Sequence, residues 1–137
     1  MAKVLLETNV VLDYLCATRP CHAQAVELLY SVLESPDGVL VVLASSLKDV
    51  YYIMCRCYHD EAIVRERLHD FLDIVELEGL TRPVVEAAFA SDEPYLEDGL
   101  VRATAELSGV DAIITRDVAS FADSPVPAMD VAAYLAR

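Results

Sequence analysis

The 137 residues suffice for one domain with a buried core, and a composition of 55% hydrophobic and 24% charged residues excludes a disordered chain. No apolar run approaches the roughly 18 residues of a membrane span and the N-terminus lacks a signal-peptide pattern, so we expect a cytoplasmic protein with no membrane partner. The net charge of −13 disfavours nucleic-acid binding unless bound divalent cations or a basic partner chain reverse the sign locally.

Short apolar runs, typical of strands, alternate with helical patterns along the whole chain. Runs such as Val39–Leu43 are typical of strands buried on both faces, whereas the more polar segment 72–77 suits a sheet edge. Strands are predicted at residues 4–6, 39–43, 72–77 and 112–115. Helices are predicted from residue 10, from Pro20 to about 35, and over 45–57, 61–71, 81–90 and 97–108, with a helical turn at 118–121 and a last helix capped by Asp130.

Local signals mark several of the predicted helix ends. Pro20 is expected in the first turn of the second helix, and Pro83 in the first turn of the helix that Thr81 caps. Ser46 and Asp49 have the spacing of a capping box. Because strands alternate with helices, we expect right-handed crossovers and a mainly parallel sheet covered on both faces. The predicted fold is therefore a three-layer α/β/α sandwich, as a single domain over residues 1–137.

Four acidic residues follow strands or begin helices in this scheme: Glu7, Asp49, Asp98 and Asp117. Ligands of parallel α/β sheets bind at the carboxyl ends of the strands, and carboxylates there suit Mg²⁺ or Mn²⁺. Two such ions about 3.5–4 Å apart can activate water for phosphodiester cleavage. Taken singly, each acid also has a structural explanation: Glu7 begins a turn, Asp49 and Asp98 favour a helix N-terminus, and Asp117 caps a helix.

Several segments resemble the motifs of PIN-domain proteins, and most of all those of VapC-type toxins from toxin–antitoxin pairs. They are Val-Leu-Leu-Glu-Thr-Asn from Val4, Ser-Leu-Lys-Asp-Val-Tyr-Tyr-Ile from Ser46, Glu-Asp-Gly-Leu-Val from Glu97 and Asp-Ala-Ile-Ile-Thr-Arg-Asp from Asp111. The resemblance implies a PIN-like fold, a Mg²⁺- or Mn²⁺-dependent ribonuclease acting on RNA, a homodimer and an antitoxin partner.

The resemblance also assigns roles to individual residues. Asp49, Asp98 and Asp117 would be catalytic metal ligands, and Asn9 and Thr115 would be supporting polar residues. The family's first acid is ordinarily an aspartate, and here it is Glu7. The extra methylene moves the carboxylate outward, and Mg²⁺ demands near-ideal octahedral geometry. A second hypothesis is therefore a PIN fold that has weakened or lost catalysis and serves as a partner-binding module.

Other residue groups carry weaker hypotheses. Zinc is considered for the cysteine-rich segment, but a Cys-x-Cys pair on a helix points its thiols roughly 200° apart, so reduced thiols are expected at Cys16, Cys21, Cys55 and Cys57. Tyr51, Tyr52 and Tyr58 suit base stacking or, more often, a core or interface. The available phosphate contacts form no basic stripe: Arg56, Arg65, Arg67, Arg102 and Arg116.

Overall fold

A five-stranded parallel sheet forms the centre of the computed structural model, which describes residues 2–137. Its strands are β1 (Lys3–Leu6), β2 (Val39–Leu43), β3 (Glu76–Glu78), β4 (Ala112–Ile114) and β5 (Ala128–Met129). Their order across the sheet is β3-β2-β1-β4-β5, and each neighbouring pair is parallel. The predicted α/β/α sandwich with a parallel sheet is confirmed.

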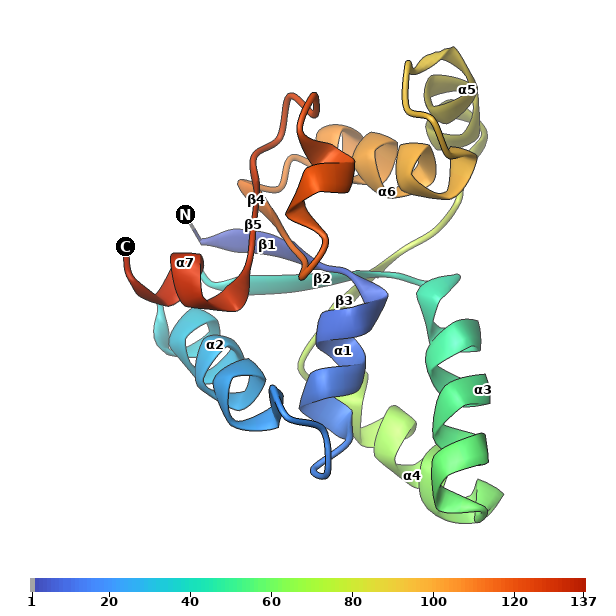
Figure 1. Ribbon diagram of the computed structural model, residues 1–137, viewed down its shortest axis with the longest axis vertical. Coiled ribbons are helices and arrows are strands. Elements are labelled where there is room, and N and C mark those ends of the chain that lie inside the picture. Colours follow the sequence, from blue (N-terminus) through green and yellow to red (C-terminus); the bar gives the residue numbers. More distant parts are fainter. Residues whose placement is uncertain (1) are drawn as a thin grey trace.

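Helices cover both faces of the sheet (Figure 1). They are α1 (Thr8–Leu15), α2 (His22–Glu34), α3 (Ser46–Tyr58), α4 (Glu61–Phe71), α5 (Arg82–Ala90), α6 (Leu96–Leu107), the 3-10 turn η1 (Val118–Phe121) and α7 (Val131–Leu135). One face carries α1 to α4 and α7, and the opposite face carries α5, α6 and η1. None of the helices within residues 2–137 combines the length and the apolar content that a bilayer crossing needs.

The alternation of side chains along β1 explains why both faces must be covered. Val4 and Leu6 pack among the residues of α1 to α4, whereas Leu5 packs on the opposite side with Val101 of α6. All three β1 residues are at most 1% exposed. A strand that is apolar on both faces can be buried only between two helical layers.

The strand order reverses at β1, which places the candidate site. The chain runs from β1 through β2 to the edge strand β3, and then crosses the other face of the sheet to place β4 on the far side of β1. At the carboxyl ends of β1 and β4, α1 and η1 therefore leave towards opposite faces. The loops that follow two adjacent strands separate there, and this topological switch point is where open α/β sheets bind ligands.

The predicted third strand is wrong in its first half. Helix α4 ends at Phe71, and residues 72–74 form a turn in which the N–H of Leu72 bonds the carbonyls of Leu68 and His69. Ile74 packs against the core under this turn, so its apolar side chain serves tertiary packing, not a strand. The strand itself is shorter, and its edge position next to β2 is confirmed.

Helix ends show a mixture of confirmed and mistaken predictions. Asp130 accepts the N–H of Ala133 at 2.8 Å as the predicted cap of α7. Pro20 precedes α2 and lies outside its first turn. Ser46 is the first residue of α3, and its side chain, 7% exposed, makes no capping bond. The predicted capping box is therefore absent. Thr81 occupies the N-cap position of α5, but its side chain accepts no bond there.

Candidate active site

The candidate site begins at Glu7, the residue between β1 and α1. Its N–H donates to the carbonyl of Ile114 on β4 at 3.0 Å, and its own carbonyl accepts the N–H groups of Val10 and Val11 in the first turn of α1. Glu7 thus ends the strand ladder and is at the same time the N-cap residue of the helix, with extended backbone. These bonds fix the side chain at the switch point.

Two polar side chains hold the Glu7 carboxylate. The hydroxyl of Thr115, the residue after β4, donates to one carboxylate oxygen, and the amide nitrogen of Asn9 lies 3.1 Å from the same oxygen. Thr115 is fully buried. A carboxylate that accepts hydrogen bonds from two side chains keeps one orientation.

The same residues shape the loop after β4. The carbonyl oxygen of the Asn9 side chain accepts the N–H of Arg116 at 3.2 Å, and the Thr115 hydroxyl accepts the N–H of Asp117 at 2.9 Å. The hydroxyl of Ser120 donates to the Asp117 carboxylate at 2.5 Å. The position of Asp117 is therefore set by bonds with Thr115, at the end of β4, and with Ser120 on η1.

Asp98 reaches the site from the first turn of α6, on the opposite face of the sheet from α1. The next residue, Gly99, lies so close to α5 that a Cβ atom there would stand 3.1 Å from the hydroxyl oxygen of Ser91 and 3.3 Å from the carbonyl oxygen of Ala88. A glycine weakens a helix start, and the close contact with α5 is the physical reason for it. This close packing of α6 against α5 fixes the position of the helix start that carries Asp98.

Asp49, in the first turn of α3, joins Glu7 and Asn9 in lining a cavity of about 470 Å³. Glu97 and Arg19 line the same cavity. The sequence patterns did not single out either of these two residues. Glu97 precedes Asp98, and this adjacency in the first turn of α6 was a signal that could have included it.

Charge and burial act together on the carboxylates at this edge. Burial raises the pKa of Glu7, and the charges of Asp98 and Asp117 raise it further, while the bonds from Thr115 and Asn9 lower it. Burial also raises the pKa of Asp98, with further contributions from the charges of Asp117 and Glu93. A neighbouring negative charge that raises the pKa of a carboxyl group repels its ionised form, and a bound cation would relieve that repulsion.

The donor set agrees in chemistry with a divalent cation. Glu7, Asp49, Asp98 and Asp117 offer only oxygen atoms, which are the ligands of Mg²⁺ and Mn²⁺. Within residues 2–137, no three His, Cys, Asp or Glu side chains stand close enough together to hold an ion as they are oriented here. Asp49 is exposed, so its side chain has room to turn towards an ion, whereas the exposed carboxylate of Asp117 is held by the hydroxyl of Ser120.

Two of the arginines considered as phosphate contacts are paired with carboxylates, and the cysteines form no disulfide within residues 2–137. Arg102 on α6 forms ion pairs with Asp92, Glu93 and Glu106, at 2.9, 3.2 and 3.7 Å, so it does not offer a free phosphate contact. Arg65 is paired with Glu61 on its own helix. All four cysteines are free thiols.

Similarity to known proteins agrees with this fold. A sequence model of the PIN domain matches residues 3–119. Comparison with curated protein sequences gives no significant match. Among solved structures, FitAcB from Neisseria gonorrhoeae is 22% identical, covers 93% of this chain and 97% of its own, and has a TM-score of 0.72.

Two further structures have the same fold. A toxin–antitoxin complex from Klebsiella pneumoniae is 22% identical, covers 93% of this chain and 97% of its own, and has a TM-score of 0.69. The sarcin–ricin-loop-cleaving toxin VapC20 of Mycobacterium tuberculosis is 19% identical, covers 80% of this chain and 86% of its own, and has a TM-score of 0.64. With the match of the PIN-domain model over most of its length, the chain belongs to the PIN-domain family.

Proposed function

We propose that this PIN domain is a ribonuclease dependent on Mg²⁺ or Mn²⁺ and the toxin of a toxin–antitoxin pair, active in the cytoplasm. The observation that carries the proposal is that Asp98 and Asp117 come close enough to Glu7, at the switch point of the sheet, for their charges to raise its pKa. These three residues come from different segments of the chain to the edge of the sheet where α/β folds bind ligands, and Glu7 and Asp49 line a cavity there.

The side chains have separate tasks in the proposed reaction. Glu7, Asp49, Asp98 and Asp117 would hold the cation, which when bound lowers the pKa of a water and stabilises the leaving oxygen. Thr115 and Asn9 keep the Glu7 carboxylate in one orientation. Ser120 does the same for Asp117. The chain thus supplies the anionic oxygens of the proposed site, and residues at the edge of the cavity would position the substrate.

A partner protein and an RNA substrate belong to the same proposal. Solved structures with this fold include a toxin–antitoxin complex from Klebsiella pneumoniae and a sarcin–ricin-loop-cleaving toxin from Mycobacterium tuberculosis. An antitoxin with basic residues would complement the net charge of −13. We also propose a homodimer.

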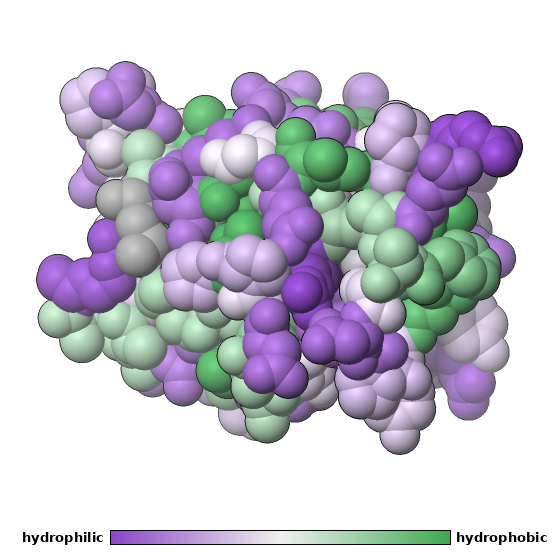
Figure 2. All heavy atoms as spheres, turned by 90° about the horizontal axis from the view of Figure 1, so that it is seen from above, coloured by the Kyte–Doolittle hydropathy of each residue, from purple (hydrophilic) through white to green (hydrophobic). Residues whose placement is uncertain are grey.

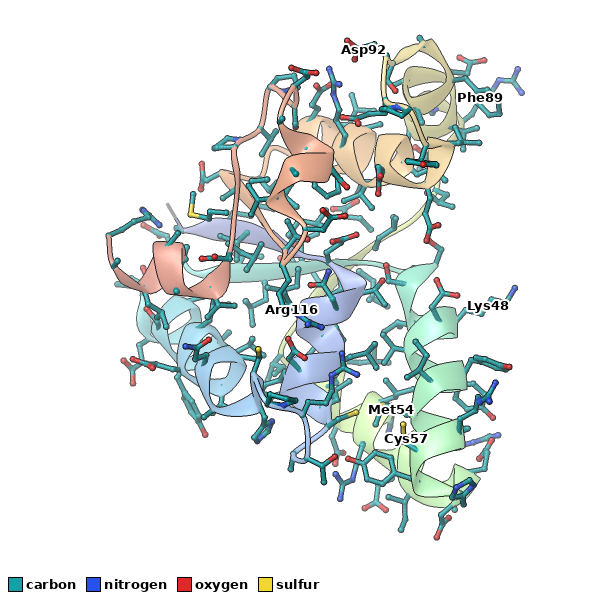
Figure 3. The ribbon with its side chains drawn as sticks, viewed as in Figure 1. Lys48, Met54, Cys57, Phe89, Asp92 and Arg116 are labelled. Atoms are coloured by element: carbon teal, nitrogen blue, oxygen red, sulfur yellow. The ribbon has the colours of Figure 1, made fainter. Side chains whose placement is uncertain are left out.

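Exposed apolar side chains on one face support the proposed protein contacts. Seen from the side of α5 and α6, separate apolar patches interrupt a largely hydrophilic surface (Figure 2). Phe89 and Tyr95 are 70% and 72% exposed, and Phe89 extends away from α5 (Figure 3). Apolar side chains that gather into a contiguous exposed patch, unlike single exposed ones, are typical of interaction surfaces.

One observation favours a non-catalytic partner-binding module as the second candidate. Glu7 is one methylene longer than aspartate, and its carboxylate oxygen is already engaged by Thr115 and Asn9. Both donors bind the same oxygen, so an ion that used this oxygen would have to share it with them. Errors of about 1 Å in positioning can cost on the order of 100-fold in rate.

The deciding experiment is calorimetric titration with Mn²⁺ and Mg²⁺, with cleavage of a structured RNA followed in the same buffers. The wild type is compared with Asp98→Asn and Glu7→Asp. Ion binding and cleavage that Asp98→Asn abolishes would support the nuclease. Wild-type protein that binds no ion and cleaves no RNA, with both restored in Glu7→Asp, would support the non-catalytic module.

A further inference from the structure

Asp13 is a buried carboxylate held between two arginines. It lies on α1, its side chain is 4% exposed, and its two oxygens pair with different guanidinium groups. The Nε of Arg19 lies 2.8 Å from Oδ1, and the Nε of Arg116 lies 3.1 Å from Oδ2. Figure 3 shows Arg116 extending from the loop after β4 towards α1.

The arginine clamp, formed by Asp13, Arg19 and Arg116, lies at the edge of the candidate active site. Arg116 stands between Thr115 and Asp117, and its backbone N–H donates to the side chain of Asn9. Arg19 lines the cavity that Glu7 also lines. The site and the clamp therefore share the loop after β4 and the first two turns of α1.

The guanidinium groups retain donors for a further ligand. Both bind Asp13 through Nε, and within the described residues 2–137 their terminal amino groups make no hydrogen bond to another side chain. The side chains of Arg19 and Arg116 are 30% and 46% exposed. A guanidinium fixed at Nε can still offer its terminal N–H groups to phosphate oxygens.

The charge balance distinguishes the clamp from an ordinary structural ion pair. One arginine would neutralise Asp13, and the second leaves a net positive charge beside a cluster of carboxylates. Elsewhere, arginines such as Arg102 and Arg65 are neutralised by carboxylates of their own surroundings. An excess of positive side-chain charge at the edge of an acidic cavity favours the binding of a polyanionic substrate.

We propose that Arg19 and Arg116 bind a phosphate group of the RNA backbone beside the cleavage point, and that Asp13 is the positioning residue that holds them. This inference rests on the proposed ribonuclease function for its substrate. It goes beyond that function by naming the residues that attract RNA to a chain of net charge −13.

The test measures binding of a fluorescent single-stranded RNA at several salt concentrations. All variants carry Asp98→Asn so that the RNA stays intact. Arg19→Ala and Arg116→Ala are each expected to weaken binding about tenfold, the effect of a lost charged hydrogen bond, and to lower the slope of log K against log salt by about 0.7. Arg65→Ala, which also removes a carboxylate-paired arginine, is the matched control and should leave the slope unchanged.

Asp13→Asn tests the positioning role separately. Both positive charges remain in this variant and one negative charge is lost, so the salt slope should not fall, while affinity falls several-fold because the arginines lose their anchor. A purely structural role would lower the melting temperature without this separation of affinity from slope. If Asp13→Asn does not fold, the two arginine variants still decide the assignment of the phosphate site.

The outcomes separate this inference from the proposed function. RNA binding that both arginine variants retain at wild-type affinity and slope overturns the phosphate site, even if the protein with Asp98 intact cleaves RNA. Arginine-dependent RNA binding supports it, even if the protein cleaves nothing. Loss of RNA binding altogether in the Asp98→Asn parent and the wild type overturns both proposals. Unchanged RNA binding with weakened antitoxin binding assigns the arginines to a protein partner instead.

Discussion

The hydroxyl of Thr115 donates to the carboxylate of Glu7 across 108 residues of sequence. The bond joins the end of β4 to the end of β1, and the same hydroxyl accepts the N–H of Asp117. One buried side chain therefore links two of the four candidate acidic residues. Its removal affects the stability of the fold and the geometry of the site together.

Replacement of Thr115 by valine keeps the shape of the side chain and removes its hydroxyl. The N–H of Asp117 then loses its acceptor, and Glu7 keeps only the bond from Asn9. We expect the free energy of unfolding to fall by about 1–3 kcal/mol, measured by denaturant titration. Thr104→Val is the matched control: Thr104 is also buried, but its hydroxyl only bonds the carbonyl of Leu100 on its own helix. Equal losses in both variants would contradict a special role for Thr115.

Glu7→Gln is expected to stabilise the protein at neutral pH in the absence of metal. Burial and the charges of Asp98 and Asp117 raise the pKa of Glu7, so the folded state favours the neutral carboxyl group. The stability that this preference contributes is present at low pH and is lost as pH rises above the ordinary value of 4.5 through the raised one. Because the carboxyl group is partly exposed, the gain at pH 7 should not exceed about 1 kcal/mol.

The measurement for Glu7→Gln is the melting temperature of both proteins between pH 4 and 8. The advantage of the variant should grow with pH over the lower part of this range. Added Mn²⁺ should raise the melting temperature of the wild type and leave that of the variant unchanged. A variant that is less stable than the wild type at pH 7 without metal would contradict the electrostatic account.

Gly99→Val is expected to displace the first turn of α6. A Cβ atom at this position meets Ser91 and the carbonyl of Ala88 at 3.1 and 3.3 Å, and the branches of valine add further crowding. We expect a loss of about 1–3 kcal/mol in unfolding free energy and weaker Mn²⁺ binding, because Asp98 moves with the turn. Gly79→Val is the control, since no atom lies within 4 Å of its Cβ position. Unchanged metal binding in Gly99→Val would show that the position of Asp98 does not matter for the metal site.

Phe121→Ala is expected to destabilise the protein by about 3–5 kcal/mol in chemical denaturation, because it leaves a cavity beneath η1. Phe121 is 2% exposed and packs with Leu5, Val101 and Ile113. Val118 lies on the same 3-10 turn and is 38% exposed, so Val118→Ala should cost less than about 0.5 kcal/mol. Similar losses in the two variants would show that η1 is not anchored by Phe121.

Local patterns in the sequence were sufficient for most of the elements. The apolar run of β2 predicted its bounds, and the alternation of strands with helices predicted a parallel sheet with two covered faces. Prediction failed where tertiary packing overrode a local pattern. Residues 72–74 form a turn against the core, and Ser46 is buried at the start of α3 without capping it.

The sequence also placed the acidic residues at strand ends and helix starts, since these positions follow from element boundaries alone. Only the tertiary structure decided which of them meet. The crossing from β3 to the far side of β1 brings β4 beside β1, and with it Asp98 and Asp117 to Glu7. The arginine clamp on Asp13 arises in the same way, because Arg116 is distant in sequence and reaches α1 only through this pairing. Local propensities act over a few residues, whereas the contacts between distant segments depend on how the whole core is packed.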